Sequence, residues 1–413
     1  MSVYRWLDER LDLDRFNKKF MRKAFPVHHS FFLGEIALFS FIILVLTGLF
    51  LTFNFEPSTR MVKYEGQELP AAYVSVLYID SLPFGKVIRS AHHWAAHIMV
   101  ASVFLHLLRI LVSGAYKKPR EINWLLGLAL LALTVVVAFI GYSLPFDAFS
   151  VTATQIGYGI GKSIPYIGDW IAQLTFGGEY PTVHSIPRLY ALHVLWLPLL
   201  LMALIGVHML IMIKQKHTQP KYAEEVAPGK ILGVPMMPMQ LSVMTVLFLL
   251  YLGVLFILAG AIIAHPIEVY GPPGTSTPAL KPDWYFLWIY GILQIIPSSW
   301  QIPLPGGASI TSEFIGGILI PGILGIAALL LPFVDTRKTK MRYVELPTEH
   351  PMRTSVTVGI LFFLFVATFA GWKEEFGMTN GQLWAMLIFI PLAAWFTTYV
   401  LIRQVWGKKA KSE

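Results

Sequence analysis

Four histidines stand at matched intervals in two apolar stretches of the sequence. His92 and His106 are 14 residues apart, and His193 and His208 are 15 residues apart. At about 100° per residue, 14 helical residues return to within roughly 40° of the starting face and rise about 21 Å. Each helix therefore presents one imidazole near each of its ends. Two such helices that face each other form two bis-imidazole sites, one above the other.

Paired imidazoles on facing helices can hold haem iron with both axial positions filled, and such a haem passes single electrons rather than binding oxygen. The chain contains no cysteine, which excludes thioether-linked haem and iron–sulfur ligation. We expect His92 with His193 to hold an outer b-type haem, and His106 with His208 to hold an inner one. Interhelical hydrogen bonding would account for any one intramembrane histidine, but not for four at matched depths.

The second histidine pair contains one residue more than the first. This spacing requires about 60° of additional rotation between His193 and His208. Pro198 lies between them, and we expect a proline kink there to absorb the difference.

Glycines repeat the histidine spacing in two further apolar stretches. Gly34 and Gly48 are 14 residues apart, as are Gly127 and Gly141. A flat macrocycle needs a helix surface without side chains, so these glycines predict two haem slots; ordinary packing of small residues is the alternative. Three arginines near the histidines are candidate partners for haem propionates, with snorkelling to lipid headgroups as the alternative. They are Arg89, Arg109 and Arg188.

Eight apolar stretches are long enough to cross about 30 Å of hydrocarbon. They cover approximately 32–53, 90–113, 123–143, 187–213, 240–264, 313–334, 354–372 and 382–403. Only 14% of the residues are charged, whereas a soluble domain has about 25%. We therefore predict an all-α integral membrane protein with eight transmembrane helices. Residues 1–235 form a four-helix di-haem domain, and residues 236–413 contain the other four helices.

The distribution of positive charge predicts the orientation. Most Lys and Arg residues lie in the two terminal segments and in the loops on the same side, so the positive-inside rule places both termini in the cytoplasm. The net charge of +8 follows from this topology and does not indicate nucleic-acid binding. Residues 1–25 are amphipathic, contain no cleavable signal peptide, and suit a helix lying in the membrane interface.

Several stretches resemble the cytochrome b subunit of quinol–cytochrome c oxidoreductase (cytochrome bc) complexes. RSAHHWAAHIMVASVFLHLLR and PRLYALHVLWLPLLLMALIGVH resemble its haem-ligand helices, and GYSLPFD and PDWYF resemble the sequences of its outer quinol site. The resemblance covers nearly the whole chain and thins after about residue 340. VYRWLDERLDL and KKPRE are most similar to the chloroplast and cyanobacterial branch, whose two separate chains correspond to one fused chain here.

The resemblance implies quinol oxidation near the outer face, with Asp283, Tyr285 and Tyr290 as site residues. A carboxylate there is a suitable acceptor for the protons of quinol. One electron would pass to a Rieske-type iron–sulfur protein, and the other through both haems to a quinone near the cytoplasmic face, coupled to proton translocation. The family further implies a c-type cytochrome partner, a lipid environment, a homodimer and a bacterial plasma-membrane location.

Three positions depart from the family pattern. Asp283 stands where the family usually has Glu, a variant that we associate with lower-potential quinones, so menaquinol is the expected substrate. Phe146 replaces the usual Trp, and Phe32 replaces the cysteine that attaches an extra haem in the chloroplast-like branch. Lys214 and Arg109 lie near the depth expected for the inner quinone site.

Two other classes are alternatives. The di-haem anchor of a hydrogenase or formate dehydrogenase would use four or five helices and needs neither the last four spans nor PDWYF. A transporter with histidine proton relays would show inverted repeats and broken helices, which the sequence lacks. The remaining histidines are expected to be non-ligands: His93 and His97 lie off the ligand stripe, and the others lie in loops or at span ends, where solvation explains them. These others are His28, His29, His217, His265 and His350. His184 lies in the loop after the third span, where it could face a partner, although nothing in the sequence requires this.

Overall fold

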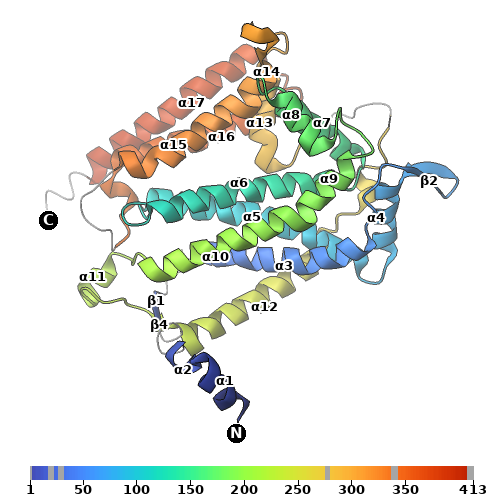
Figure 1. The fold of residues 1–413 in the computed structure, drawn as a ribbon. Helices are drawn as coiled ribbons and strands as arrows, with labels where there is room; N and C mark the ends of the chain where they lie inside the picture. The colour runs from blue at the N-terminus through green and yellow to red at the C-terminus, as the bar shows by residue number, and fades with distance from the viewer. Residues whose placement is uncertain (1, 17–22, 27–31, 275–279, 336–342, 407–413) are drawn as a thin grey trace.

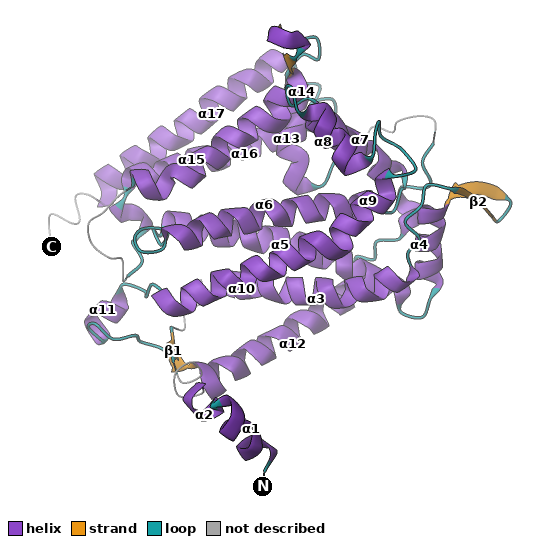
Figure 2. Ribbon diagram, in the orientation of Figure 1, coloured by secondary structure: helices purple, strands orange, loops and turns teal. Residues whose placement is uncertain are grey.

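The computed structural model describes residues 2–16, 23–26, 32–274, 280–335 and 343–406, and shows a bundle of long helices (Figures 1 and 2). Within these residues, eight helices are long and apolar enough to cross a membrane. The first three are α3 (Phe32–Asn54), α5 (Gly85–Val112) and α6 (Glu121–Ser143), and the seventh is α16 (Pro351–Ala370). The predicted all-α integral membrane architecture with eight spans is confirmed.

The other four spans each combine α-helical and π-helical segments. The fourth consists of α9 (Ser185–Ala191), η3 (Leu192–Trp196) and α10 (Leu197–Gln215), and the fifth of η4 (Met236–Gln240), α12 (Leu241–Ile257) and η5 (Leu258–Ile262). The sixth consists of α14 (Ser312–Phe314), η8 (Ile315–Leu319) and α15 (Ile320–Val334), and the eighth of α17 (Asn380–Leu401) and η10 (Ile402–Trp406).

Short elements lie in the connections between the spans. The helices among them are α4 (Ala71–Ser81), α7 (Ala148–Lys162), α8 (Gly168–Phe176), α11 (Tyr222–Val226), η6 (Ile267–Val269), α13 (Trp284–Ile295), η7 (Pro305–Gly307) and η9 (Pro347–Glu349). Two antiparallel hairpins pair β2 (Met61–Tyr64) with β3 (Gln67–Pro70), and β5 (Gln301–Pro303) with β6 (Ser309–Thr311). The long loops therefore carry their own secondary structure.

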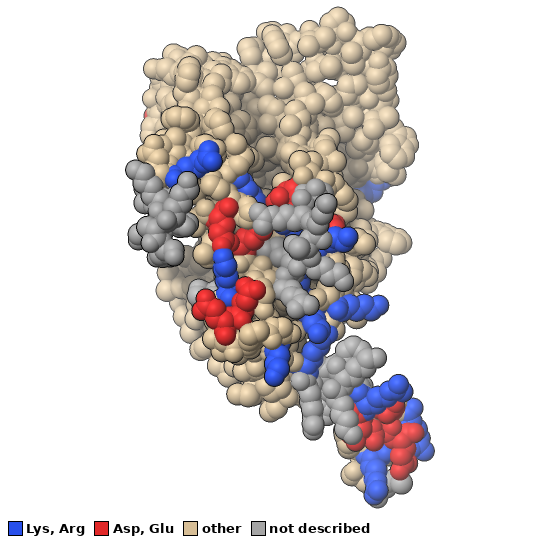
Figure 3. Space-filling view, turned by 90° about the vertical axis from the view of Figure 1, so that its left-hand side faces the viewer, with Lys and Arg blue, Asp and Glu red and all other residues tan. Residues whose placement is uncertain are grey.

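The two ends of the bundle carry different short elements and different side chains. Helices α1 and α11 and the C-terminal end of α17 lie at one end, whereas α4, the β2–β3 hairpin, α7 and α8 lie toward the other (Figure 1). Figure 3 looks onto the first end, where Lys, Arg, Asp and Glu side chains gather, while the upper part of this view shows almost only uncharged residues. Large apolar side chains such as Phe53, Phe365 and Phe389 are exposed on the spans. Lipid contact explains this exposure, because a monomer in water rarely exposes so much apolar surface.

The fourth span accommodates its extra residue through a π-turn. The backbone N–H of Leu197 donates to the carbonyl of Leu192, five residues earlier. Such a turn inserts one residue into an α-helix. Pro198 follows directly and cannot donate the next α-helical hydrogen bond, which favours the wider turn. The predicted effect of Pro198 is therefore present, but the structure achieves it with a π-turn that ends just before the proline.

The N-terminal segment is broken rather than one continuous helix. Helix α1 (Val3–Leu11) ends at Asp12, whose φ of 49° is left-handed, and α2 (Leu13–Phe16) follows. Strand β1 (Ala24–Phe25) pairs antiparallel with β4 (Val234–Pro235). The segment is thereby attached to the chain that precedes the fifth span.

Separate buried clusters join the spans. Ile43 of α3 packs with Ala91 and Ala95 of α5 and with Leu255 of α12, so the fifth span belongs to the same packing unit as the first two. In a second cluster, α13 packs against α16 and α17 through Ile292, Ala367 and Leu383. The division of the chain at residue 235 stays a prediction.

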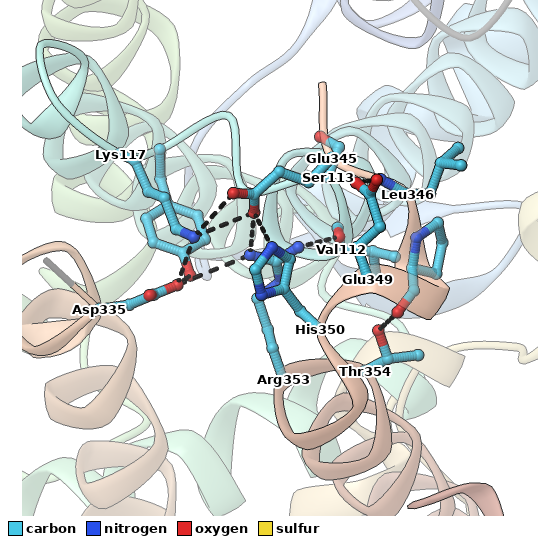
Figure 4. Close-up of polar contacts among 12 residues, drawn as sticks. Val112, Ser113, Lys117, Asp335, Glu345, Leu346, Glu349, His350, Arg353 and Thr354 are labelled. Atoms are coloured by element: carbon cyan, nitrogen blue, oxygen red, sulfur yellow. Dashed lines mark hydrogen bonds and ion pairs between the residues drawn. The ribbon is translucent and has the colours of Figure 1, made fainter. Parts of the chain in front are cut away.

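A buried ionic cluster connects the α5–α6 loop to the second half of the chain (Figure 4). Lys117, whose side chain is only 3% exposed, lies 3.0 Å from Glu345 and 3.1 Å from Asp335. Arg353 of α16 lies 2.6 Å from the same Glu345 carboxylate. Tyr116 donates a hydrogen bond to Asp335 at 2.6 Å. Two cations and two carboxylates thus balance one another where three segments meet.

Replacing Lys117 by methionine is expected to destabilise the protein by about 3 kcal/mol, because removing one member of a buried ion pair leaves its partner uncompensated. Thermal unfolding of the solubilised protein measures the loss. Lys118→Met is the matched control, since Lys118 is exposed at the next position. Equal stability of the two variants would contradict a stabilising role for the cluster.

The same cluster makes stability depend on pH. Burial raises the pKa of Glu345, but hydrogen bonds and charges from Arg353 and Lys117 outweigh it, and the pKa falls below its usual 4.5. The stabilisation is therefore complete above about pH 5 and is lost as the pH falls through the lowered value. In Lys117→Met this acid-side loss of stability should be smaller.

Candidate functional site: a cavity shared by two histidines and a carboxylate

A cavity with a volume of about 480 Å³ lies between the second and fourth spans. His92 and His193 line it from facing helices, and Asp283 and Tyr285 line it from the start of α13. The structure therefore brings the expected outer ligand pair and the expected quinol-site residues into one continuous space. Tyr290 lies further along α13 and is not part of this lining.

The outer histidine pair has the spacing needed to hold a metal between the rings. The ring centroids of His92 and His193 are 6.2 Å apart. Two imidazoles that each coordinate a metal at about 2 Å place their centroids about 6 Å apart. Both histidines are half-buried between the helices, and a haem iron between the rings fits the observed geometry.

Hydrogen bonds fix both outer histidines in the tautomer that coordinates through Nε2. His193 Nδ1 is 3.0 Å from the carbonyl oxygen of Val137, which can only accept, so Nδ1 carries the proton. The Thr47 hydroxyl donates to the carbonyl of Ile43 at 2.6 Å, so its oxygen accepts from His92 Nδ1 at 2.8 Å. Both Nε2 atoms therefore keep a lone pair for a metal. This arrangement is the usual support for a metal-binding histidine.

The inner pair lies nearer the other end of the same two spans. His106 and His208 are close enough to interact electrostatically. The Nδ1 atom of His106 is buried and has no hydrogen-bond partner among the described residues. A buried polar atom without a partner is uncommon in a finished structure. Among the described residues, His106 therefore lacks the Nδ1 hydrogen bond that orients both outer histidines.

The four predicted glycines each face one of the four histidines. A Cβ atom on Gly141 would lie 2.6 Å from His193 Cε1, and one on Gly48 would lie 3.3 Å from His92 Cε1. Gly34 faces His106 in the same way at 3.3 Å, and Gly127 faces His208 at 3.9 Å. The two glycines of α3 therefore lie against the histidines of α5, and the two glycines of α6 lie against the histidines of the fourth span. They give room to the imidazole rings, whereas the sequence suggested room for the macrocycle.

The three predicted arginines have different surroundings. Arg89 lines the cavity, but its guanidinium already forms a bidentate ion pair with Asp80, with both distances 2.7 Å. Arg188 donates to the carbonyls of Gln173 and Leu174 at the end of α8 and is not part of the cavity lining. Arg109 occupies the last turn of α5, near His106. A direct role for Arg188 at a haem therefore gains no support from its contacts.

Asp283 occupies the N-cap position of α13. It precedes the first helical residue, yet its side chain makes no capping hydrogen bond. Its Oδ2 atom instead accepts a hydrogen bond from the Tyr285 hydroxyl at 2.9 Å. Burial raises the pKa of Asp283, while the neighbouring His97 and the Tyr285 hydrogen bond oppose the rise. The carboxyl group is thus a stronger base than a solvated aspartate.

Sequence reasoning missed three histidines of this cavity, which we call the histidine cluster: His93, His97 and His265. The rings of His93 and His265 stack with centroids 4.0 Å apart, and His97 Nε2 lies 3.1 Å from His93 Nε2. Solvation does not explain His265, whose pKa is lowered to about 4 by burial and then by Arg89 and His97. No spacing rule marks this loop residue, because the contact joins segments far apart in sequence.

The other histidines vary in environment. His217 packs against Phe25 with ring centroids 4.4 Å apart, and His350 lies 3.0 Å from Glu345. His184 is exposed, as expected. His28 and His29 lie outside the described residues.

These features define an all-α integral membrane protein with half-buried imidazoles that pair between its second and fourth spans. The chain belongs to the cytochrome b family. Residues 97–272 match the model described as Cytochrome b(N-terminal)/b6/petB, and residues 273–390 match Cytochrome b(C-terminal)/b6/petD.

Curated relatives and a solved structure agree with this assignment. The chain is 35% identical to the cytochrome bc1 complex cytochrome b subunit of Streptomyces coelicolor, over 95% of this chain and 76% of that one. It is also 35% identical to the subunit of the same name from Corynebacterium diphtheriae, over 92% of this chain and 74% of the relative. A solved structure titled "Hyperthermophilic respiratory Complex III" has a TM-score of 0.74 at 25% identity, covering 97% of this chain and 98% of that chain.

Proposed function

We propose that this chain is the di-haem cytochrome b subunit of a membrane-bound quinol:cytochrome c oxidoreductase. The observation that carries the proposal is the single cavity in which His92 and His193 face each other beside Asp283 and Tyr285. Family membership supports b-type haems and quinone binding in general.

The histidines hold the cofactors. His92 with His193 binds the outer haem, and His106 with His208 binds the inner one. Thr47 and the Val137 carbonyl keep the outer imidazoles in the coordinating tautomer. When bound, the two haems supply one-electron transfer across the membrane.

Asp283 is the base at the outer quinol site. Quinol loses two protons with its two electrons, and a partly buried carboxylate with a raised pKa is a suitable acceptor. The Tyr285 hydroxyl holds the carboxylate toward the cavity, and Tyr290 lies on the same helix. Aspartate at this position favours menaquinol as the substrate. The inner quinone site lies near Lys214 and Arg109.

The remaining parts of the complex follow from the family. A Rieske-type iron–sulfur protein takes one electron and delivers it to a c-type cytochrome, and the complex is a homodimer in a bacterial plasma membrane. Both termini lie in the cytoplasm, so protons released at the outer cavity leave on the opposite side. Quinol oxidation there and quinone reduction near the cytoplasmic face translocate protons.

A reduced-minus-oxidised absorption spectrum of the purified complex tests this function. We expect two b-type haems for each chain, and oxidation of added naphthoquinol with reduction of a c-type cytochrome. A colourless preparation would contradict the proposal and would favour a transporter. A di-haem anchor subunit would have four or five spans, so the eight spans of this chain argue against that class.

A further inference from the structure

His97 occupies a place in the outer cavity that the proposed function does not use. It projects from α5 and lines the cavity together with Asp283 and Tyr285. Its imidazole centroid lies 5.8 Å from that of the Tyr285 ring, and the Tyr285 hydroxyl donates to Asp283. Imidazole is the side chain whose ordinary titration falls closest to neutral pH. A second proton carrier thus stands beside the carboxylate expected to receive the proton of quinol.

Hydrogen bonds define the protonation of His97 in this structure. The indole Nε1–H of Trp284 donates to His97 Nδ1 at 3.0 Å. Because an indole nitrogen can only donate, Nδ1 of His97 carries a lone pair. Neutral His97 therefore has its proton on Nε2, which lies 3.1 Å from His93 Nε2. The atom of His97 that can take up a proton is therefore Nδ1, which accepts the hydrogen bond from Trp284, the residue next to Asp283.

One side-chain hydrogen bond, from the Tyr285 hydroxyl, holds the Asp283 carboxyl group in the cavity. Its side chain makes no capping hydrogen bond to α13, so a rotation about the side-chain bonds need break only the bond from Tyr285. It is also electrostatically coupled to His97, because the charge on His97 affects the pKa of the carboxyl group. A rotation of the Asp283 side chain can therefore carry a bound proton toward the ring without moving the helix.

We propose that His97 accepts, at Nδ1, the proton that Asp283 removes from quinol. This proposal rests on the proposed function. In the first step a quinol O–H bond breaks and an O–H bond forms on Asp283. In the second step that bond breaks and an N–H bond forms at His97 Nδ1, while the indole of Trp284 gives up its hydrogen bond. The electrons leave the quinol by the route already proposed. The carboxylate regenerated on Asp283 then attracts the imidazolium.

The groups that set the charge of His97 come from three elements. His93 lies on the same helix, and Asp283 and Tyr285 lie at the start of α13. His265, in the loop after η5, is neutral near pH 7 because burial lowers its pKa to about 4. Asp283 is the acidic member of this set, so it favours the protonated form of His97.

The variant His97→Asn separates proton transfer from positioning. Asparagine places an oxygen near the position of Nδ1 and can still accept from Trp284, but it cannot carry a proton. In the assembled complex with a short-chain naphthoquinol, we expect both haems to be retained, KM to stay within about twofold, and kcat to fall at least about 10-fold. The pH dependence of kcat should lose the inflection that comes from His97.

Trp284→Phe provides a second measurement. Loss of the indole donor removes a hydrogen bond that favours neutral His97, so the acid side of the kcat profile should move to higher pH. This result supports the proposal even where His97→Asn assembles poorly, and an unshifted profile overturns it. A His97→Asn complex with the wild-type rate at every pH also overturns it.

Quinol oxidation by the complex and proton transfer through His97 can be tested separately. A wild-type complex with two haems that does not oxidise quinol refutes the proposed function, and this inference with it. A wild-type complex that oxidises quinol, together with an unaffected His97→Asn variant, refutes only the role of His97.

Discussion

Replacing His193 by alanine is expected to remove the outer haem and to leave the inner haem bound. The outer pair loses one of two axial nitrogens, whereas His106 and His208 lie about 21 Å away along the same two helices. The haem content should fall from two to one for each chain, and quinol oxidation should stop because the outer cavity has lost its electron acceptor. Pyridine haemochrome quantitation and turnover with naphthoquinol measure the two effects.

His265→Ala is the matched control, because His265 lines the same cavity but lies outside the ligand pair. It should retain both haems. Gly141→Ala reaches the outer site by a different route: its methyl group would lie 2.6 Å from His193 Cε1, so the ring must shift. Gly127→Ala, with 3.9 Å to His208 Cε1, should be tolerated. If His193→Ala keeps two haems, the assignment of the outer ligands is wrong.

Replacing Asp283 by asparagine should leave both haems in place and slow quinol oxidation by roughly 100-fold, the usual contribution of a positioned base. Asparagine has the same shape and cannot accept the proton. Because burial raises the pKa of Asp283, the wild-type rate should fall on acidification at a pH above the usual 3.8. Turnover requires the carboxylate form of Asp283, so the rate is at its maximum above the raised pKa of this group and declines below it.

Asp283→Glu is the control, since it keeps a carboxylate at the same backbone position and should restore most of the rate. Steady-state turnover across pH, with haem spectra of each variant, makes the comparison. An Asp283→Asn complex with unaltered turnover would remove this residue from the mechanism.

The spans could be predicted from sequence because lipid demands long apolar helices. The second span begins at Gly85, earlier than expected, because the ion pair between Arg89 and Asp80 lets a charged residue lie inside the helix. Helix α13 was not predicted as a helix, because its 12 mostly apolar residues are too few to cross a membrane. The π-turn in the fourth span was predicted only as a kink at Pro198.

The histidine ligands were predictable because their spacing follows helical periodicity. The contacts that orient them were not, since Thr47 and the Val137 carbonyl come from other spans. The histidine cluster was missed for the same reason: His265 reaches His93 from a loop more than 150 residues away in the sequence. Periodicity describes one helix at a time, whereas a shared cavity depends on the packing of several.

The ionic cluster in Figure 4 also constrains how the protein is made. Asp335 and Glu345 are synthesised long after Lys117, and Arg353 alone leaves one of their two negative charges uncompensated. Until the seventh span is inserted, the α5–α6 loop must keep its lysine hydrated. Closure of the cluster therefore marks insertion of the seventh span, with the eighth still to follow, and in a nascent chain that stops before Asp335 the charged α5–α6 loop stays open to water.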